Sequence, residues 1–233
     1  MKLGIIGAMD VEVATLKEIM QEKSEKEIAG SVYCEGTLEG LPAVVVQCGV
    51  GKVNAAMCAQ VLCSCYGVTH LVNTGIAGSL DASLDIGDFV ISRDAIYHDM
   101  DVTNWNYPIG QVPGMDVCAF PADDKLIGLA YQVADTAHPG HVHIGRVASG
   151  DQFIRTKEQK NKIISDTCAV CTEMEGAAIA HTAYRNGVPF VVIRAISDKA
   201  DDSAEMDYPT FEAMAARRCA EVTRLLAKKI QNA

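Results

Sequence analysis

Two stretches in the last third of the chain combine acids with a cation in a pattern that could carry acid–base chemistry. Glu173-Met174-Glu175-Gly176 opens a run of small residues typical of a closely packed helix, and an apolar, β-branched run ends in Arg194-Ala195-Ile196-Ser197-Asp198. Arg194 and Asp198 are four residues apart, so in an extended chain they project to the same side. An arginine inside an apolar strand needs a partner, because an unpaired buried charge is costly. Each residue alone could be structural, but the combination favours a functional site.

A third acid, Glu12, lies in the first turn of the helix that follows the strand 2–7. A surface acid stabilised by the helix dipole is an equally good interpretation of Glu12 alone. However, Glu12, Glu175 and Asp198 are all predicted near the carboxyl ends of strands, where open α/β sheets bind ligands. Paired acids without a metal-ligand cluster fit cleavage of a glycosidic bond, in which one acid activates water and another protonates the leaving group. No serine or cysteine stands in a nucleophile-elbow pattern, which disfavours acyl transfer.

Two glycine-rich stretches are predicted to be turns at strand ends. Gly49-Val50-Gly51-Lys52 follows the strand 41–48, and Gly75-Ile76-Ala77-Gly78 follows the strand 69–74. Neither is a Walker A loop, and the first strand is not followed by G-x-G-x-x-G, so no nucleotide cofactor is expected. Close backbone turns lining a pocket are the predicted role of both stretches.

Strands alternate with helices along the whole chain. Further strands are predicted at 31–38, 88–98, 141–148, 168–172 and 188–196, and helices at 9–20, 52–66, 123–135, 157–165 and 177–187. A final helix is expected to begin with Asp207 as its N-cap and Pro209 in its first turn. The pattern predicts an α/β fold with one domain over residues 1–233, in which helices flank a central, mixed, mostly parallel twisted sheet.

One long loop, residues 99–122, interrupts this alternation and carries Trp105, Tyr107 and Pro113. Loops of this length inside a compact domain are usually lids, binding loops or interface segments, although packing of the loop onto its own core is also possible.

Composition excludes several classes of partner. The 233 residues are 49% hydrophobic, the net charge is −10 and there is no basic run, so nucleic acid and anionic membranes are poor partners. No apolar stretch reaches the length of a membrane span, and Met1-Lys2 leads straight into a strand, so a cytoplasmic protein is expected. In such a protein the nine scattered cysteines are expected to be mostly small buried hydrophobic residues. The Cys168–Cys171 pair lacks a second pair, and the three histidines at 138, 141 and 143 lack matching ligands, so no metal is expected.

Seven blocks, in order along essentially the whole chain, resemble the 5′-methylthioadenosine/S-adenosylhomocysteine nucleosidase family of the nucleoside phosphorylase/hydrolase superfamily. They are Gly4-Ile5-Ile6-Gly7-Ala8-Met9 with Glu12, Gly51-Lys52-Val53, Asn73-Thr74-Gly75, Tyr97-His98-Asp99-Met100-Asp101-Val102, Ser149-Gly150-Asp151, Glu173-Met174-Glu175, and Arg194-Ala195-Ile196-Ser197-Asp198.

The resemblance implies metal-independent hydrolysis of the N-ribosidic bond of 5′-methylthioadenosine and S-adenosylhomocysteine, and also of 5′-deoxyadenosine, with release of adenine. Asp198 would protonate adenine N7, Glu12 would deprotonate the attacking water, Glu175 would bind the ribose hydroxyls, and Arg194 would fix this network. The implied substrate-binding residues are Met174, Phe153, Ile154, Glu173, Ile76, Ala77, Gly78, Met9, Val50, Val102, Trp105, Tyr107, Pro113, Tyr208 and Phe211. Among them, Met174 would pack on the sugar, Phe153 would stack on the base, and the backbone of Phe153 and Ile154 would read the adenine edge.

The resemblance also implies a homodimer, in which residues near 102–113 reach the partner's site. One position departs from the family pattern: the block Asn-Thr-Gly-Ser-Ala-Gly commonly has a serine that helps order water and acid, and here that position is Ile76. Trp105 and Tyr208 replace other aromatic residues, which is conservative.

Three other functions stay open at this point. A phosphorylase of the same superfamily would need arginines around a phosphate pocket, and the glycine stretches contain none. A hydrolase of 6-amino-6-deoxyfutalosine would share the adenine and ribose recognition. A non-catalytic nucleoside-binding or storage protein would be indicated by loss of the acids, and all three are present.

Overall fold

The apolar, β-branched runs of the chain form the strands at the centre of the sheet. The computed structural model describes residues 1–201 and 203–232. Within it β1 (Leu3–Gly7), β5 (His70–Ser79) and β10 (Phe190–Asp198) are buried along almost their whole length. Strands covered on both faces need such continuous apolar sequence. The three lie side by side, because β5 pairs in parallel with both β1 and β10.

The remaining strands extend this sheet. They are β2 (Gln21–Ile28), β3 (Ser31–Leu38), β4 (Leu41–Gln47), β6 (Phe89–Tyr97), β7 (Phe120–Pro121), β8 (Val142–Ser149) and β9 (Cys171–Glu173). The strand order is β10-β6-β8-β9-β5-β1-β4-β3-β2, and β7 pairs with β6. The predicted mixed sheet is confirmed, with antiparallel pairings as numerous as parallel ones among the described residues.

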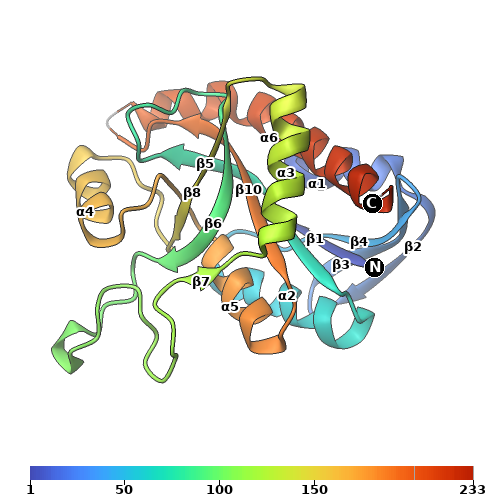
Figure 1. Ribbon diagram of the computed structural model, residues 1–233, viewed down its shortest axis with the longest axis horizontal. Helices are drawn as coiled ribbons and strands as arrows, with labels where there is room; N and C mark the ends of the chain where they lie inside the picture. The colour runs from blue at the N-terminus through green and yellow to red at the C-terminus, as the bar shows by residue number, and fades with distance from the viewer. Residues whose placement is uncertain (202, 233) are drawn as a thin grey trace.

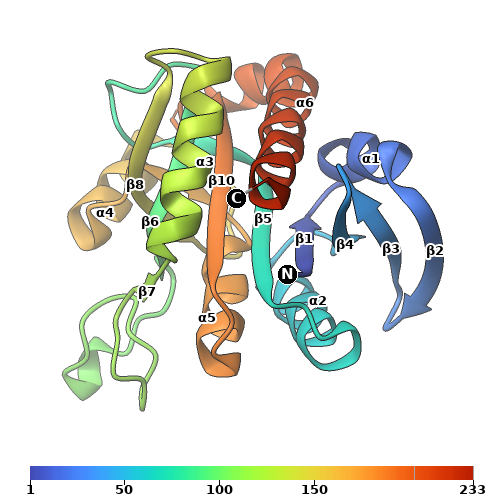
Figure 2. The ribbon, with the colours of Figure 1, turned by 45° about the vertical axis from the view of Figure 1, so that its right-hand side comes forward.

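Half of the sheet closes on itself. β10 pairs with β5 on one side and with β6 on the other, while β6 continues through β8 and β9 back to β5. These five strands therefore form a closed ring, from which β1, β4, β3 and β2 extend as an open sheet (Figure 2). The sequence analysis did not anticipate this closure.

Helices cover both faces of the sheet. α1 (Asp10–Ile19), α3 (Asp124–Ala137) and α6 (Ala204–Gln231) pack together on one face, and α2 (Lys52–Tyr66) packs against α5 (Gly176–Asn186) on the other (Figures 1 and 2). α4 (Lys157–Thr167) lies beside the ring. No helix in the described part of the chain is long and apolar enough to cross a membrane.

The predicted loop over 99–122 is confirmed, with one short helical turn, η1 (Thr103–Trp105), and the strand β7 near its end. In Figures 1 and 2 the loop projects from the lower edge of the molecule, and Trp105 at its tip is 62% exposed. The outer part of the loop is therefore not packed onto the core of the protein.

Three sequence-based expectations need correction. The sequence analysis assigned no strand to 21–30, yet Gln21–Ile28 forms β2 at the sheet edge. The expected turn at Gly75-Ile76-Ala77-Gly78 is wrong, because β5 runs through these residues to Ser79. The last helix does not start at Asp207: its first residue is Ala204 and its N-cap is Ser203, so Pro209 lies beyond the first turn.

Candidate active site

A pocket opens where the carboxyl ends of β1, β5 and β10 meet, as the sequence analysis expected of a ligand site in an α/β sheet. It brings together residues that are far apart in the sequence. The predicted site residues that line it are Met9, Glu12, Val50, Ile76, Ala77, Gly78, Phe153, Ile154, Glu173, Met174, Glu175, Arg194, Asp198 and Tyr208.

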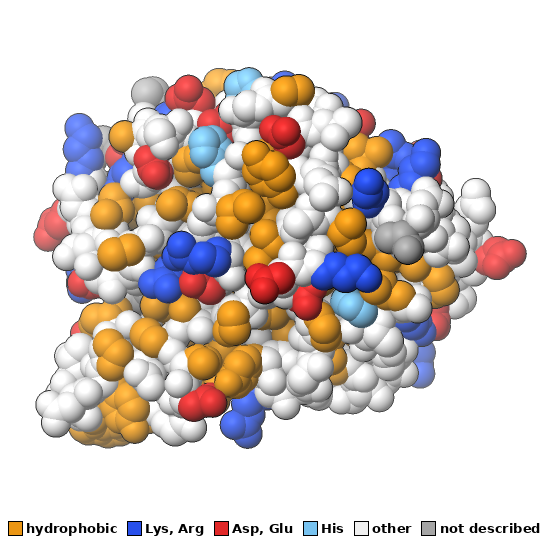
Figure 3. All heavy atoms as spheres, viewed as in Figure 1, with side chains coloured by type: hydrophobic (Ala, Val, Ile, Leu, Met, Phe, Trp, Pro, Cys, Tyr) orange, Lys and Arg blue, Asp and Glu red, His pale blue; other side chains and the backbone are white. Residues whose placement is uncertain are grey.

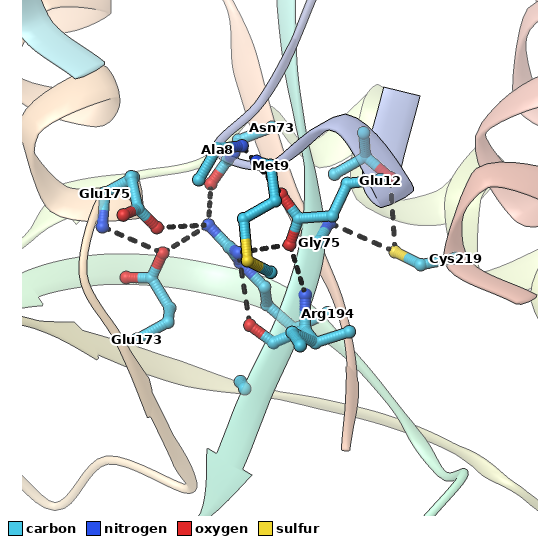
Figure 4. Close-up of polar contacts among 12 residues, drawn as sticks. Ala8, Met9, Glu12, Asn73, Gly75, Glu173, Glu175, Arg194 and Cys219 are labelled. Carbon is cyan, nitrogen blue, oxygen red and sulfur yellow. Dashed lines mark hydrogen bonds and ion pairs between the residues drawn. The ribbon is translucent and has the colours of Figure 1, made fainter. Parts of the chain in front are cut away.

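Arg194 lies at the centre of the polar network in this pocket (Figure 4). Its side chain is 1% exposed, and its guanidinium donates to the Asn73 side chain, to the Glu173 carboxylate and, over 3.2 Å, to the carbonyl of Ile76. A buried arginine with this many acceptors is held in one orientation. Arg194 therefore fixes the acids around it.

Glu12 is held from β5 and from the start of its own helix. One carboxylate oxygen accepts from the main-chain N–H groups of Ala8 at 2.6 Å and Met9 at 2.9 Å, and the other accepts from Ile76 N–H at 3.1 Å. Burial raises the pKa of Glu12, although Arg194 and these N–H groups lower it. The carboxylate is thus oriented by the backbone and remains basic enough to accept a proton.

Glu173 and Glu175 both lie just before α5, Glu173 at the end of β9 and Glu175 as the N-cap of the helix. Both oxygens of Glu173 are occupied, because the carboxylate accepts from Gly176 N–H, Glu175 N–H and Ser149 Oγ as well as from Arg194. Such a carboxylate satisfies the free N–H groups of the helix N-terminus. Glu173 therefore lines the pocket as a residue that positions Arg194, with no oxygen free for a ligand.

Glu175 has one oxygen committed and one facing the network. Its Oε1 accepts from Gly51 N–H at 2.8 Å, and its Oε2 lies 3.6 Å from the Arg194 guanidinium. Burial and then repulsion by Glu173 raise the pKa of Glu175 to about 7, against the attraction of Arg194. This acid can therefore exchange a proton close to neutral pH.

Asp198 ends β10 and is 2% exposed. Its carboxylate accepts from Ala200 N–H at 2.8 Å and from Ser197 Oγ at 2.9 Å. Burial raises the pKa of Asp198 above its ordinary value, and nearby Asp207 and Asp201 raise it further. A carboxyl group with a raised pKa is better suited than an ordinary aspartate to act as a general acid.

The two glycines of β5 make room for these side chains. A Cβ atom on Gly75 would clash with the Arg194 guanidinium and lie 2.5 Å from Glu12 Oε1, and one on Gly78 would lie 2.7 Å from Asp198 Oδ1. Glycine is used here so that charged groups can approach the strand directly. The sequence pattern was noticed, but it reflects close approach within a strand and not a turn.

Two aromatic rings close one side of the pocket. Phe153 and Tyr208 meet edge to face, with ring centroids 5.5 Å apart and planes at 82°. Phe153 lines the pocket and is 42% exposed, so part of its side chain is available to a ligand. The Tyr208 hydroxyl contacts Met9 Sδ at 3.3 Å, which joins α6 to the start of α1.

Five predicted substrate-binding residues do not line this pocket of the single chain. They are Val102, Trp105, Tyr107, Pro113 and Phe211. The first four belong to the projecting loop, which lies at the lower edge of the molecule in Figure 1. Their expected contact with a substrate stays a prediction, because they do not line the pocket in the described structure.

Four lining residues were missed. Ala8 and Ser197 lie within two of the family blocks but were not named as site residues, and Gln152 directly follows the block Ser149-Gly150-Asp151. Thr172 precedes Glu173 in β9, and no feature of the sequence marks its hydroxyl as facing a pocket.

The polar groups of the pocket do not form a metal centre. In the described ranges, no group of three histidine, cysteine, aspartate or glutamate side chains is arranged to hold a metal ion. The carboxylates around Arg194 are engaged by N–H donors and by the guanidinium. Such carboxylates can serve as acids, bases and acceptors for a ligand's hydroxyl groups.

Comparison with known proteins gives this arrangement a family. A family model described as the phosphorylase superfamily matches residues 2–228. A 5′-methylthioadenosine/S-adenosylhomocysteine nucleosidase from Actinobacillus succinogenes is 42% identical over 98% of this chain and 99% of its own length. The chain belongs to the 5′-methylthioadenosine/S-adenosylhomocysteine nucleosidase family.

Solved structures of nucleosidases have the same fold. The Neisseria meningitidis enzyme of this family, in complex with methylthio-immucillin-A, is 36% identical, with a TM-score of 0.94 over 97% of this chain and 98% of that one. A futalosine hydrolase from Helicobacter pylori is 31% identical, with a TM-score of 0.93 over 98% and 97% of the two chains. The expected nucleoside phosphorylase-like fold is confirmed.

The position at which this chain departs from the expected nucleosidase pattern, Ile76, lies on β5 within the pocket. Its main chain, not its side chain, contacts the network: the N–H donates to Glu12 and the carbonyl accepts from Arg194. An isoleucine therefore preserves these two contacts and places an apolar side chain, 6% exposed, in the pocket wall.

Proposed function

We propose that this protein hydrolyses the N-ribosidic bond of 5′-methylthioadenosine and S-adenosylhomocysteine, releasing adenine and the 5′-substituted ribose. The observation that carries the proposal is the set of three buried acids, Glu12, Glu175 and Asp198, around a pocket whose one lining arginine is already paired. The names of its relatives support the same substrates.

In the proposed reaction the bond between C1′ and the adenine N9 breaks, and its electron pair goes to the base. Asp198 gives its proton to adenine N7 as the base leaves, and Glu12 takes a proton from the water whose oxygen bonds to C1′. The transition state resembles a ribosyl cation, so the buried carboxylates stabilise its developing charge. The raised pKa of Asp198 suits it to the role of acid, and the hydrogen bonds from Ala8, Met9 and Ile76 orient Glu12 as the base.

Glu175 is proposed to bind the ribose hydroxyls with its Oε2, because Oε1 is held by Gly51. Met174 is proposed to pack on the sugar, and Phe153 on the base, because part of the Phe153 side chain is available to a ligand. Arg194 and Glu173 are proposed to act by holding the acids in position.

Water, and not phosphate, is the proposed nucleophile. Among the described residues that line the pocket, Arg194 is the one Lys or Arg, and its guanidinium is bound to Asn73, Glu173 and the Ile76 carbonyl. A phosphate dianion would meet uncompensated carboxylates there, which is strongly unfavourable. A phosphorylase function is therefore disfavoured.

The test is adenine release from 5′-methylthioadenosine in phosphate-free buffer containing a metal chelator, followed by chromatography. We expect rapid release that added phosphate does not accelerate, with 5-methylthioribose and not its 1-phosphate as the second product. Release that begins only when phosphate is added would overturn the role of Glu12. Tight binding of substrate without release under either condition would favour the non-catalytic binding protein.

Hydrolysis of futalosine-type nucleosides is the second candidate, because the Helicobacter pylori futalosine hydrolase shares the fold at 31% identity. The pocket described above would recognise an adenine-ribose core with either 5′ substituent. Comparison of kcat/KM for 5′-methylthioadenosine and 6-amino-6-deoxyfutalosine decides the order of preference.

The active form is proposed to be a homodimer. On α2, Val53 and Met57 are 69% and 44% exposed, and Val50 just before it is 49% exposed while also lining the pocket. α2 and the loop 99–122 both lie at the lower edge of the molecule in Figures 1 and 2, and Figure 3 shows hydrophobic side chains gathered over the loop. A partner that covers this surface would bring its own Val102, Trp105, Tyr107 and Pro113 toward the pocket.

A cytoplasmic location is also proposed. All nine cysteines are free thiols, and five of them, including Cys171 and Cys219, are buried. Unpaired cysteines are typical of proteins that work in a reducing compartment.

A further inference from the structure

Thr172 presents a buried hydroxyl group that has no hydrogen-bond partner among the described residues. Its Oγ1 is inaccessible to solvent and the residue is 5% exposed, yet Thr172 lines the pocket. A buried hydroxyl without a partner is destabilising, so native proteins usually provide one. The structure provides none from the chain itself, which points to the contents of the pocket.

The strand pairing shows which end of the pocket this hydroxyl faces. Thr172 on β9 is directly opposite Gly78 on β5, so its side chain and the Cβ direction of Gly78 lie on the same face of the sheet. That direction at Gly78 leads to the carboxylate of Asp198, 2.7 Å from the Cβ position. Thr172 therefore points to the end of the pocket that holds Asp198.

We propose that Thr172 Oγ1 forms a hydrogen bond with a ring nitrogen of the substrate's purine base and so contributes to base specificity. This inference rests on the proposed function, in which Asp198 serves N7 and the backbone of Phe153 and Ile154 reads the adenine edge. Purine N1 and N3 are the other ring acceptors, and a hydroxyl can donate to either. The base supplies the partner that the chain lacks.

The matched variants are Thr172→Val, which keeps the shape and removes the hydroxyl, and Thr172→Ser, which keeps the hydroxyl. Calorimetric titration with adenine measures the contact without any need for turnover. We expect Thr172→Val to bind adenine roughly 5- to 30-fold more weakly, the effect of one lost hydrogen bond. Thr172→Ser should stay within about twofold of the wild type. The melting temperature of the empty Thr172→Val protein should be equal or higher, because an unsatisfied buried group is gone.

A double comparison with 1-deazaadenine and 3-deazaadenine identifies the atom. If Thr172 contacts a given nitrogen, the analogue with CH in place of that nitrogen should bind the wild type more weakly than adenine does. The same analogue and adenine should bind Thr172→Val equally well. Equal adenine affinity of wild type and Thr172→Val, or equal losses with both deaza compounds in both proteins, would overturn the proposal. If Thr172→Val does not fold, Thr172→Cys takes its place in the same comparison. Failure of hydrolysis with normal adenine binding would instead contradict the proposed function alone.

Discussion

Arg194 carries one positive charge, and three buried carboxylates share it. Glu173 is bound to it directly, while Glu175 and Glu12 lie 3.6 Å and 4.0 Å from its nitrogens. Burial raises the pKa values of both Glu12 and Glu175, repulsion by Glu173 adds to the rise at Glu175, and the attraction of Arg194 opposes the rise at both. Glu175, whose pKa is raised to about 7, can therefore exchange a proton near neutral pH, next to the proposed position of the ribose.

The first prediction at this scale concerns the general acid. Asp198→Asn keeps the size of the side chain and removes the transferable proton, so kcat for 5′-methylthioadenosine should fall by roughly 10²–10⁴ or more, while substrate still binds. Rapid-quench measurement of adenine release and calorimetric binding separate the two effects. Substantial turnover by the variant would remove Asp198 from its role.

The second prediction concerns Ile76. Because the N–H of Ile76 holds Glu12, Ile76→Ser should change kcat less than about tenfold, whereas Glu12→Gln should lower it by roughly 10²–10⁴. Steady-state kinetics of the two variants side by side provide the measurement. A gain beyond tenfold for Ile76→Ser would mean that the serine hydroxyl, and not the main chain, limits the positioning of water.

The third prediction concerns pH. The pKa of Glu175 is raised from 4.5 to about 7, so its proton is bound more tightly in the folded protein than in the unfolded chain. The resulting stabilisation is complete below about pH 4.5 and is lost as the pH rises through about 7. The difference in melting temperature between wild type and Glu175→Gln should therefore move in favour of the variant as the pH rises from 4.5 to 8. A difference that stays constant over this range would contradict a raised pKa.

At the scale of elements, strands and helices that are buried on one face or on both faces could be predicted from the sequence, because burial requires a pattern of apolar residues. β10 was recognised by the apolar run Phe190–Ile193, and β5 by a shorter apolar stretch at Leu71 and Val72. β2 was not, because its sequence QEKSEKEI is exposed along nearly its whole length and forms a strand only through pairing with β3. Propensity cannot reveal a strand that tertiary pairing imposes.

The site was predicted more fully than the elements that carry it. Acids at strand ends and the family blocks gave fourteen lining residues, such as Glu12 and Asp198. Thr172 was missed because its orientation depends on the pairing of β9 with β5, which no local pattern encodes. Gly75 and Gly78 were noticed for the wrong reason, since the need for glycine arises from side chains of β10 and α1 that approach only in the folded protein.

A three-way polar junction joins separate elements at the rim of the site and leads to the fourth prediction. Lys52 Nζ binds Asp99 at 2.6 Å, Lys52 N–H donates to Asp151 at 2.8 Å, and Asp151 N–H donates to Asp99 at 3.0 Å. It ties the start of α2, the start of the long loop, and the segment that leads to Phe153. Lys52→Met should raise KM roughly tenfold with a smaller effect on kcat, because the segment proposed to bind the base loses part of its anchor.

The matched control is Lys162→Met, which removes an exposed lysine paired with Asp166 on α4. Exposed pairs of this kind contribute little, so this variant should behave as the wild type. Equal kinetics of the two variants would show that the junction has no part in binding.

At the scale of the whole molecule, Val50, Val53 and Met57 expose apolar side chains on the surface where we propose that a second chain binds. The fifth prediction is that Val53→Asp, on the exposed stripe of α2 but outside the pocket lining, converts the protein to a monomer in sedimentation velocity. The dimer should dissociate because a charge buried in an apolar interface is costly. The kcat/KM of the variant should then fall, because the pocket loses the partner's loop. Val32→Asp, also at an exposed apolar residue but on β3, is the control that should remain dimeric. A monomeric wild type with full activity would contradict the dimer proposal.

The closed ring of strands also sets the order in which a ribosome can produce a working molecule. β10 fills the position between β5 and β6, whose residues are synthesised about a hundred positions earlier. Until Asp198 has emerged, both of those strands have an unpaired edge, and neither Arg194 nor the acid at the end of β10 exists. The nascent chain therefore carries exposed strand edges for about half of its synthesis, and the residues of the proposed chemistry are complete only after Asp198 is added.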